Sequence, residues 1–366
     1  MILPPPLILR FPAKAFPKLV DDAEIRAIPL RGDDCGNQTA HINISRMKFG
    51  SRGCLTALLF CGVSVLAMSL NAEESRRELA FAGRWDLTVT DEATKRQMPS
   101  WLELNLDHDT WKARFVGRWG NARPLPTVTV NGDRVHFVSP KEEEGSKTDL
   151  VFDGKLRGKT LSGTAIGPDG ARWKWTGRRA PALQPPGQVG WDKSLNLFNG
   201  RDFAGWHFDN PSKSSSWSVE NDYLVNKTAG SNIITDKKFR DFKLHIEVNC
   251  PSNANSGIYL RGRYEVQVED DSIEEPPSHH MGAIYGFLAP VPEQPRRPGA
   301  WQTFDIKLVG RYVTVVQNGQ TVIANQEIHG ITGGAIDSNE ESPGSIYLQG
   351  DHGGIAYRNI VLTPAR

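Results

Sequence analysis

The chain has 366 residues, a formal net charge of +1 and four cysteines. This length allows two domains with their own cores. The near-neutral charge argues against a nucleic-acid or membrane-surface binder, because such proteins depend on a large basic excess. The 35 glycines and 24 prolines are typical of a turn-rich β protein. The cysteines form no CxxC pair and no Cys/His cluster, so a structural zinc site is not expected.

The N-terminal segment has the layout of an export signal. Residues 1–46 are proline-rich and without periodicity, and we interpret them as a disordered, mis-assigned start. Residues 47–72 begin with Met47 and continue with basic residues, an uncharged apolar run and small residues, as a secretory signal peptide does. The apolar run is short for the alternative, an uncleaved membrane anchor. We therefore expect a secreted or periplasmic protein with no membrane attachment after cleavage.

The next segment, residues 78–180, predicts a small antiparallel β-barrel-like domain. Successive short stretches alternate apolar and polar residues and break at Gly, Asn and Asp. Consecutive hairpins without helices favour an up-and-down, lipocalin-like barrel, either a carbohydrate-binding or a structural accessory. Most of its tryptophans are expected to fill the core. Strands are expected at 83–89, 100–106, 111–120, 127–139, 148–167 and 171–181.

A proline-rich linker at 181–194 separates this domain from a second one at 195–366. About nine alternating strands without a helix favour a two-sheet antiparallel sandwich, a jelly roll. The sequence "QNGQ" at 317–320 predicts a type I′ hairpin. Strands are expected at 217–226, 231–237, 241–250, 256–262, 264–270, 301–310, 312–323, 344–351 and 356–364.

Three stretches of this second domain place unusual polar residues on one face of a strand. In "YEVQVED" (264–270) the hydrophobic residues alternate with Glu265, Gln267 and Glu269. Such a row is ordinarily solvated, or it lines a site. Planar polar groups and aromatic rings on one face suit a sugar, because they bond vicinal hydroxyls and stack on the ring. The other stretches contribute Tyr259 and Arg261, and Tyr347, Gln349, Asp351 and His352.

The loops next to these strands carry further candidates. "SHHMGAIYGFLAP" holds His279, His280 and Tyr285, and a pair of adjacent histidines beside a polar strand suits acid–base work or metal ligation. Trp301 follows a proline-rich loop and is either a stacking ring or a core residue.

The ordered motifs of the second domain resemble the 3-keto-disaccharide hydrolase domain family, over about residues 197–364. They are "LFNGRDFAGW", "WSVENDYL", "NSGIYLRGRYEVQVED", "GAIYG", "WQTFDIKLVG" and "IYLQGDHGGIAYRNI". The resemblance implies a concanavalin-like jelly roll that cleaves glycosides already oxidised to a ketone at C3. Such a ketone acidifies the C2 proton, so that a base can remove it, the C1 substituent can leave and water can add, for net hydrolysis.

This chemistry needs a base near C2, a donor or cation for the enolate, and an acid for the leaving oxygen. A bound divalent ion is one candidate for stabilising the negative charge of the enolate, and Arg261 is the other. On this basis the candidate catalytic residues are Glu265, Asp270, His279, His280 and His352, and the candidate metal ligands are Glu265, His280 and His352. The residues expected to bind the carbohydrate substrate are Tyr259, Arg261, Gln267, Tyr285, Trp301, Tyr347 and Gln349.

Two other functions remain open at this stage. One is an ordinary glycan hydrolase of the laminarinase-like jelly-roll type. However, Glu265 and Glu269 are about 13 Å apart in a regular strand, and a carboxylate pair needs less than about 10 Å. The other is a secreted carbohydrate-binding module without catalysis, which would not need a cluster of titratable groups.

Overall fold

The computed structural model describes residues 73 and 75–366, except 119, 142–145, 168–169, 186, 211–215 and 271–274. The proposed start and signal peptide lie outside these residues, as do Trp119 and most of the expected turn at 168–170. The described residues belong to one compact unit. Within the described part, a short helical segment at 75–79 and the 3-10 turn η2 (Pro277–His279) accompany two all-β bodies. No described helix is long and apolar enough to cross a membrane.

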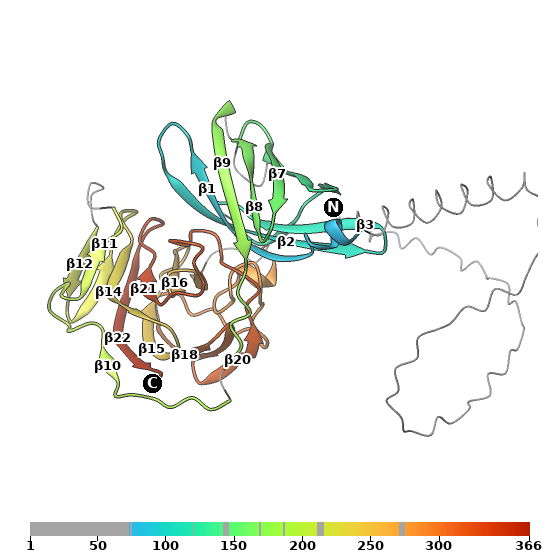
Figure 1. Ribbon diagram of the computed structural model, residues 1–366. Coiled ribbons are helices and arrows are strands. Elements are labelled where there is room, and N and C mark those ends of the chain that lie inside the picture. The colour runs from blue at the N-terminus through green and yellow to red at the C-terminus, as the bar shows by residue number, and fades with distance from the viewer. Residues whose placement is uncertain are drawn as a thin grey trace, which may run out of the picture. The chain divides into compact units, whose positions relative to one another are not determined.

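The first body is a single nine-stranded antiparallel sheet, in which each strand pairs with its sequence neighbour and β9 returns to β1 (Figure 1). Its edge strands β4 and β5 are joined by only two residues, so the sheet must curl back on itself like a barrel. Pro124 and Pro126 stand at this seam, and neither has an N–H to donate across it. The strands are β1 (Gly83–Asp91), β2 (Gln97–Asp107), β3 (Thr110–Val116), β4 (Arg123–Pro124), β5 (Thr127–Asn131), β6 (Arg134–Ser139), β7 (Leu150–Arg157), β8 (Thr160–Ile166) and β9 (Arg172–Arg179).

Aromatic side chains fill the inside of this curled sheet. Trp85 and Trp175 are buried in its core, where Trp175 contacts the stacked rings of Phe137 and Phe152. Trp101 is an exception, because it lies in a separate small cluster with residues of the second body. The tryptophans of the core are therefore packing residues, as expected.

The second body is a two-sheet antiparallel jelly roll, which confirms the predicted fold class. One sheet has the order β12-β13-β22-β15-β18-β19-β20, with β10 paired to β22, and the other has the order β11-β14-β21-β16-β17. The strands are β10 (Leu195–Asn196), β11 (Trp206–Phe208), β12 (Trp217–Glu220), β13 (Tyr223–Asn226), β14 (Ile233–Phe239), β15 (Phe242–Asn249), β16 (Asn255–Leu260), β17 (Tyr264–Glu269), β18 (Trp301–Val309), β19 (Tyr312–Gln317), β20 (Gln320–Glu327), β21 (Gly344–Leu348) and β22 (Ile355–Pro364).

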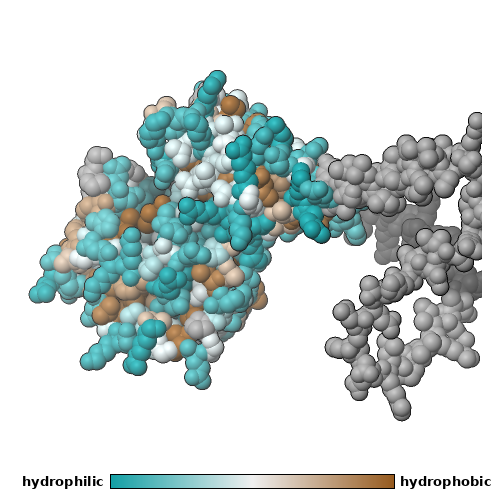
Figure 2. Space-filling model, in the orientation of Figure 1, coloured by the Kyte–Doolittle hydropathy of each residue, from teal (hydrophilic) through white to brown (hydrophobic). Residues whose placement is uncertain are grey.

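Alternation along the strands produces the sandwich core. In β15 every second residue from Phe242 is buried, and its partners β18 and β22 repeat the pattern. The "QNGQ" hairpin forms as predicted, with Asn318 and Gly319 both at positive φ. Figure 2 shows hydrophilic side chains over much of the visible face of the described residues, with hydrophobic patches between them.

Strand β17 differs from this pattern because all six of its residues are buried. Tyr264, Val266 and Val268 enter the core, as the alternation predicts. The opposite face, with Glu265 and Gln267, is covered as well, so it is not an ordinary solvated surface. Loops of the jelly roll lie over this face. Two members of the polar row, Glu265 and Gln267, are therefore part of a cavity floor rather than of an open surface.

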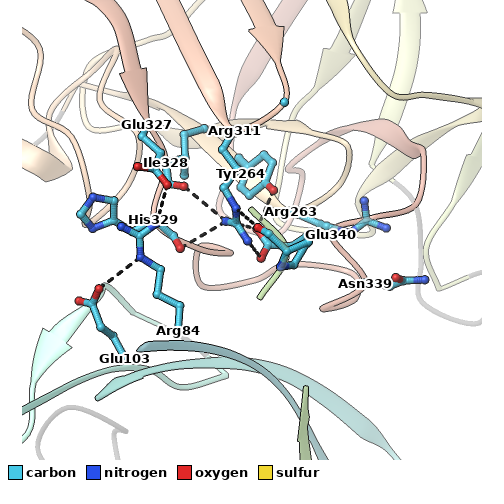
Figure 3. Close-up of polar contacts among 12 residues, drawn as sticks. Arg84, Glu103, Arg263, Tyr264, Arg311, Glu327, Ile328, His329, Asn339 and Glu340 are labelled. Carbon is cyan, nitrogen blue, oxygen red and sulfur yellow. Dashed lines mark hydrogen bonds and ion pairs between the residues drawn. The ribbon is translucent and has the colours of Figure 1, made fainter. Parts of the chain in front are cut away.

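A buried polar network joins the two bodies (Figure 3). Arg84 of β1 donates to Glu327 of β20 at 2.6 Å. Arg311 pairs with Glu340, both fully buried, and Arg311 also donates to the carbonyl of Pro181 at 2.7 Å. Tyr264 donates to the same Glu340 carboxylate at 2.6 Å. Polar partners from both bodies and from the segment between them thus converge on one region.

Asp86 of β1 also lies in this region, and it gives the first testable prediction. Burial and the neighbouring Glu340 raise the pKa of Asp86 from 3.8 to about 10. Its contribution to stability is therefore complete below about pH 4 and is lost as pH rises toward 10. Asp86→Asn removes this titration. As pH rises, the free energy of unfolding of the wild-type protein should therefore fall relative to that of the variant, by up to about 1.4 kcal/mol per pH unit. Urea unfolding from pH 5 to 9 measures this difference, and parallel curves would contradict it.

Candidate active site

A cavity of about 380 Å³ opens over the polar face of β16 and β17. Its volume falls within the range of small-molecule sites. Strands β16 and β17 and the segment directly after β21 supply its floor, and the loops at 282–286 and 333–334 supply its sides. Six residues predicted from the sequence line it together, namely Tyr259, Glu265, Gln267, Tyr285, Gln349 and His352.

Glu265 is the central titratable group of the cavity floor. Its side chain is only 4% exposed, and its carboxylate lies over Gly257 of the neighbouring strand, where any Cβ would overlap it. Burial raises the pKa of Glu265 to about 8, and the negative charges of Asp351 and Glu269 act in the same direction. The hydrogen bond from Tyr259 opposes this shift. The carboxyl is therefore mostly protonated at neutral pH.

The hydrogen bonds of Tyr259 agree with a protonated Glu265. The Tyr259 hydroxyl lies 2.9 Å from Glu265 Oε2 and 2.8 Å from the carbonyl oxygen of Gly333. A phenol has one proton and cannot donate to both acceptors. When Glu265 is protonated it donates to Tyr259, and Tyr259 donates to Gly333. The geometry thus satisfies both groups in the neutral state.

Two loops are fixed to β17 by backbone hydrogen bonds. Tyr285 N donates to the Glu265 carbonyl at 3.1 Å, and Gln267 exchanges two bonds with residues 282–283, so this loop extends the sheet edge. On the other side Thr332 Oγ1 accepts from the Glu265 N–H at 3.1 Å. The ring of His279 packs on Tyr285 at a centroid distance of 4.5 Å. Both walls are therefore held in place before any ligand binds.

The cavity also contains hydrogen-bond acceptors without a protein partner. Gln267 donates to Glu269 through Nε2 at 3.0 Å, and its Oε1 is buried without a partner. Gln349 Oε1 is buried and unpartnered in the same way. Unsatisfied buried oxygens are costly unless a ligand or water donates to them. Sugar hydroxyls are suitable donors.

Asp351 and His352 close the cavity at the end of β21. His352 Nδ1 lies 2.7 Å from Asp351 Oδ1, and both residues line the cavity. A carboxylate at Nδ1 orients the ring and favours the tautomer that carries its proton on Nδ1. His352 is about half exposed on its side chain, so it remains accessible.

Three predicted catalytic residues lie outside this cavity. Asp270 is buried and paired with Arg296 at 3.0 Å, beyond the end of β17. His279 is bonded through Nδ1 to Glu275 at 2.6 Å, and it supports Tyr285 from behind. His280 bonds Glu293 at 3.0 Å. The two adjacent histidines are therefore turned to loop carboxylates rather than to Glu265.

Three predicted substrate-binding residues are also placed elsewhere. Arg261 has a φ of 55° just after β16, and this left-handed turn directs its side chain to Asp241 at 2.7 Å and the Gly310 carbonyl at 2.9 Å. Trp301 lies on β18 of the other sheet, with the guanidinium of Arg358 4.0 Å from its ring centroid. Tyr347 stacks on Tyr259 at 4.3 Å, so it supports the floor but lines a neighbouring cavity.

The proposed metal ligands do not form a coordination site in the structure. Glu265 and His352 line one cavity, but His280 is held by Glu293. Among the described residues, no group of three or more His, Cys, Asp or Glu side chains is placed to hold a metal ion. Glu265, His280 and His352 are therefore not arranged to hold a divalent ion, and side chains alone are considered as the acid and the base.

The cavity contains residues that were not in the predicted site. Asn255 is the first residue of β16 and of the motif "NSGIYLRGRYEVQVED" that contains Tyr259. Gly333 and Gly334 follow Thr332 and approach the Tyr259 hydroxyl so closely that a Cβ on Gly334 would overlap it. The two glycines in the sequence "TGG" are the one signal that could have indicated a place where the backbone comes close to another group. Gly120 comes from the first body, and no pattern in the sequence connects it to this site.

The match to a known family is confined to the second body. Residues 193–363 match the family model described as the 3-keto-alpha-glucoside-1,2-lyase-like domain, which confirms the resemblance inferred from the motifs. The similarity to that family therefore covers the jelly-roll part of the chain and not the N-terminal body. No relative is found among curated proteins.

Several solved structures are similar to the second body. One is a candidate glycosyl hydrolase from Parabacteroides distasonis, with 29% identity, 50% of this chain and 94% of that chain covered, and a TM-score of 0.41. Another candidate glycosyl hydrolase from the same organism has 26% identity, coverage of 47% and 98%, and a TM-score of 0.37. A carbohydrate-binding module from Bacillus subtilis has 14% identity, coverage of 43% and 93%, and a TM-score of 0.30. Likeness at these TM-scores supports no conclusion about activity.

Proposed function

We propose that the protein cleaves glycosidic bonds in sugars that carry a ketone at C3, by elimination followed by hydration. The observation that carries this proposal is a buried carboxyl, Glu265, whose pKa is raised to about 8 by burial and which shares one cavity with the Asp351–His352 pair. An elimination needs an acid and a base at the same time, and these two groups supply them. The unpartnered oxygens of Gln267 and Gln349 are acceptors for hydroxyls of the same sugar.

The proton transfers follow from these positions. His352 Nε2 removes the C2 proton, which the C3 ketone has made acidic, and Asp351 stabilises the resulting imidazolium. The hydroxyl of Tyr285, which also lines the cavity, donates to the enolate oxygen that develops at C3. The C1–O bond breaks as Glu265 gives its proton to the leaving oxygen. Water then adds across C1=C2, with its oxygen bonding to C1 while Glu265 takes back a proton and C2 is reprotonated. The sum is hydrolysis.

An ordinary glycan hydrolase is the second candidate. The sequence suggested Glu265 and Glu269 as its carboxylate pair, but Glu269 bonds Gln267 and is not in the lining of the cavity. Asp351 is there instead, close enough to raise the pKa of Glu265. A protonated carboxyl and a second carboxylate in one cavity are the two groups that such an enzyme uses.

Turnover of oxidised and native sugars distinguishes the two candidates. The mature protein is incubated in D₂O with 3-keto-trehalose, trehalose or laminarin, before and after EDTA. The proposal predicts glucose and 3-keto-glucose from 3-keto-trehalose alone, with enzyme-dependent deuterium at C2. Cleavage of trehalose or laminarin, or a product without deuterium beyond that of an enzyme-free control, would favour the second candidate. Binding without turnover of any substrate would favour a binding module.

The pH dependence of this activity is a further prediction. Because the leaving group needs the proton of Glu265, kcat/KM should decrease as pH rises through about 8. Above that pH the decline should approach tenfold per unit, since one proton is lost. Rates with 3-keto-trehalose between pH 5 and 10 measure this limb. A profile that stays flat to pH 10 would remove Glu265 as the acid.

We also propose that the protein is exported, on the basis of the signal-peptide layout that begins at Met47. N-terminal sequencing of the protein from expressing cells tests this proposal. A first residue between 68 and 73 is expected, and an N-terminus at or before Met47 would contradict it.

A further inference from the structure

A second cavity of about 690 Å³ adjoins the proposed active site. The two cavities share Gly334 and Asp351 in their linings. Tyr259 lines the first and Tyr347 the second, and their rings stack at 4.3 Å, so the cavities share one aromatic support. Both volumes are within the range of small-molecule sites. A ligand that spans Gly334 and Asp351 would occupy both.

The curled N-terminal sheet supplies one wall of this second cavity. Arg96 and Met98, at the start of β2, and Arg118, after β3, line it. The opposite wall comes from the jelly roll, with Asp209, Ile234 and Tyr347. Gly120 of the same N-terminal loop reaches the first cavity. The N-terminal body therefore lines both cavities, although it lies outside the family match.

This wall is fixed to the jelly roll. The N–H of Gly334 donates to the carbonyl of Arg118 at 3.2 Å. Asn121 and Ala122 pack against Gly286, which has a φ of 70° and no room for a Cβ. Beside them Trp101 packs edge-on against Phe287 at a centroid distance of 5.3 Å. The arginines are thus presented by a packed interface, and the wall needs no rearrangement to form.

The two walls differ in hydrogen-bonding chemistry. Arg96 and Arg118 bring only donors, whereas Asp209 and Asp351 on the jelly-roll side bring acceptors. Arg118 is partly buried near Arg96, and these two effects lower its pKa to about 10. A hydroxyl both donates and accepts, so a neutral sugar satisfies both walls. An anionic group would be repelled by Asp209 and Asp351, and a cationic group by the arginines.

We propose that this second cavity binds the sugar that leaves, so that the N-terminal sheet is a substrate-binding part of the enzyme, with Arg118 as a specificity residue. The proposal rests on the proposed function and adds a binding role for the N-terminal sheet, which would favour a neutral second ring over a small substituent as the leaving group. The oxidised ring occupies the first cavity and the second ring lies between Arg118 and Tyr347. Without the second cavity, the N-terminal sheet would be interpreted as an accessory domain that takes no part in substrate binding.

The experiment compares two substrates that differ only in the leaving group, 3-keto-trehalose and methyl 3-keto-α-glucopyranoside. Arg118→Ala should raise KM for 3-keto-trehalose by about tenfold or more, the range expected for loss of a charged hydrogen-bond donor. Its kcat should stay within about twofold, and the methyl glycoside should be unaffected. Arg178→Ala, an exposed arginine on β9, is the matched control and should change neither substrate. Equal losses on both substrates, or no loss, would overturn the subsite.

Binding separates failure of the subsite from failure of the proposed reaction. If the wild-type protein cleaves neither keto sugar, the proposed function is wrong. Calorimetric titration with unoxidised trehalose and methyl α-glucopyranoside then tests the subsite alone. Wild-type protein should bind trehalose about tenfold more tightly than methyl α-glucopyranoside. The Arg118→Ala variant should bind the two sugars with equal affinity, and its melting temperature should be unchanged. Equal affinity of the wild-type protein for both sugars would reject the second subsite.

Discussion

Glu265→Gln is expected to lower kcat for a 3-keto-disaccharide by about 10²- to 10⁴-fold, the usual contribution of a general acid or base. The amide fills the same volume over Gly257 and can still bond Tyr259, so the cavity keeps its shape. What it lacks is the proton that the leaving oxygen needs. KM should change by less than about threefold, because hydroxyl contacts to Gln267 and Gln349 remain. Steady-state kinetics with 3-keto-trehalose at pH 7 measure both parameters.

Stability should be nearly unaffected in this variant. Glu265 is mostly protonated in the folded protein at neutral pH, so a neutral amide replaces a neutral carboxyl. Glu220→Gln on β12 is the matched control, since this carboxylate is ion-paired with Lys227 on the surface of the other sheet. The control should retain full activity. A Glu265→Gln protein that remains folded and fully active would rule out Glu265 as the acid.

The fold was predictable because its information is local. Apolar and polar residues alternate in β15 and β17, and this pattern specifies strands. Turn residues such as Asn318-Gly319 specify hairpins. The order of the strands in the two sheets is not local. It depends on pairings such as β22 with β13 and β15, which link residues more than a hundred positions apart.

The site was predicted where it follows a strand and missed where it depends on loops. Glu265 and Gln267 share one face of β17 because a strand has a period of two, and Tyr259 joins them because it pairs with Glu265 across the β16–β17 hairpin. Arg261 has the same spacing, but its positive φ ends the strand and turns the side chain away.

Residue type alone did not show which histidine lines the cavity. His279, His280 and His352 are all titratable, yet only His352 lines the cavity, because the other two are bonded to loop carboxylates. Gly120 and Arg118 belong to the first body. Only the packing of the two bodies brings them to the cavities, and the sequence contains no signal for that packing.

Arg311→Met is expected to lower the free energy of unfolding by about 3–5 kcal/mol, the usual cost of removing one partner of a buried ion pair. Arg311 and Glu340 are both fully buried, and Glu340 has Asp86 beside it on the other body. Although burial alone would lower it, the carboxylate of Glu340 keeps the pKa of Arg311 above its usual value. Without the guanidinium, Glu340 keeps the hydrogen bond from Tyr264 but has lost its positively charged partner (Figure 3).

The same substitution removes the bond from Arg311 to the Pro181 carbonyl, so the junction between the two bodies should loosen together with the jelly roll. Urea unfolding at pH 7 measures the loss. Arg366→Met is the control, because its pair with Asp192 is exposed and should contribute less than about 1 kcal/mol. If the penalty comes from a stranded charge, then Arg311→Met combined with Glu340→Gln should recover part of it. A double variant that is as unstable as the sum of the single ones would show that the two side chains act separately.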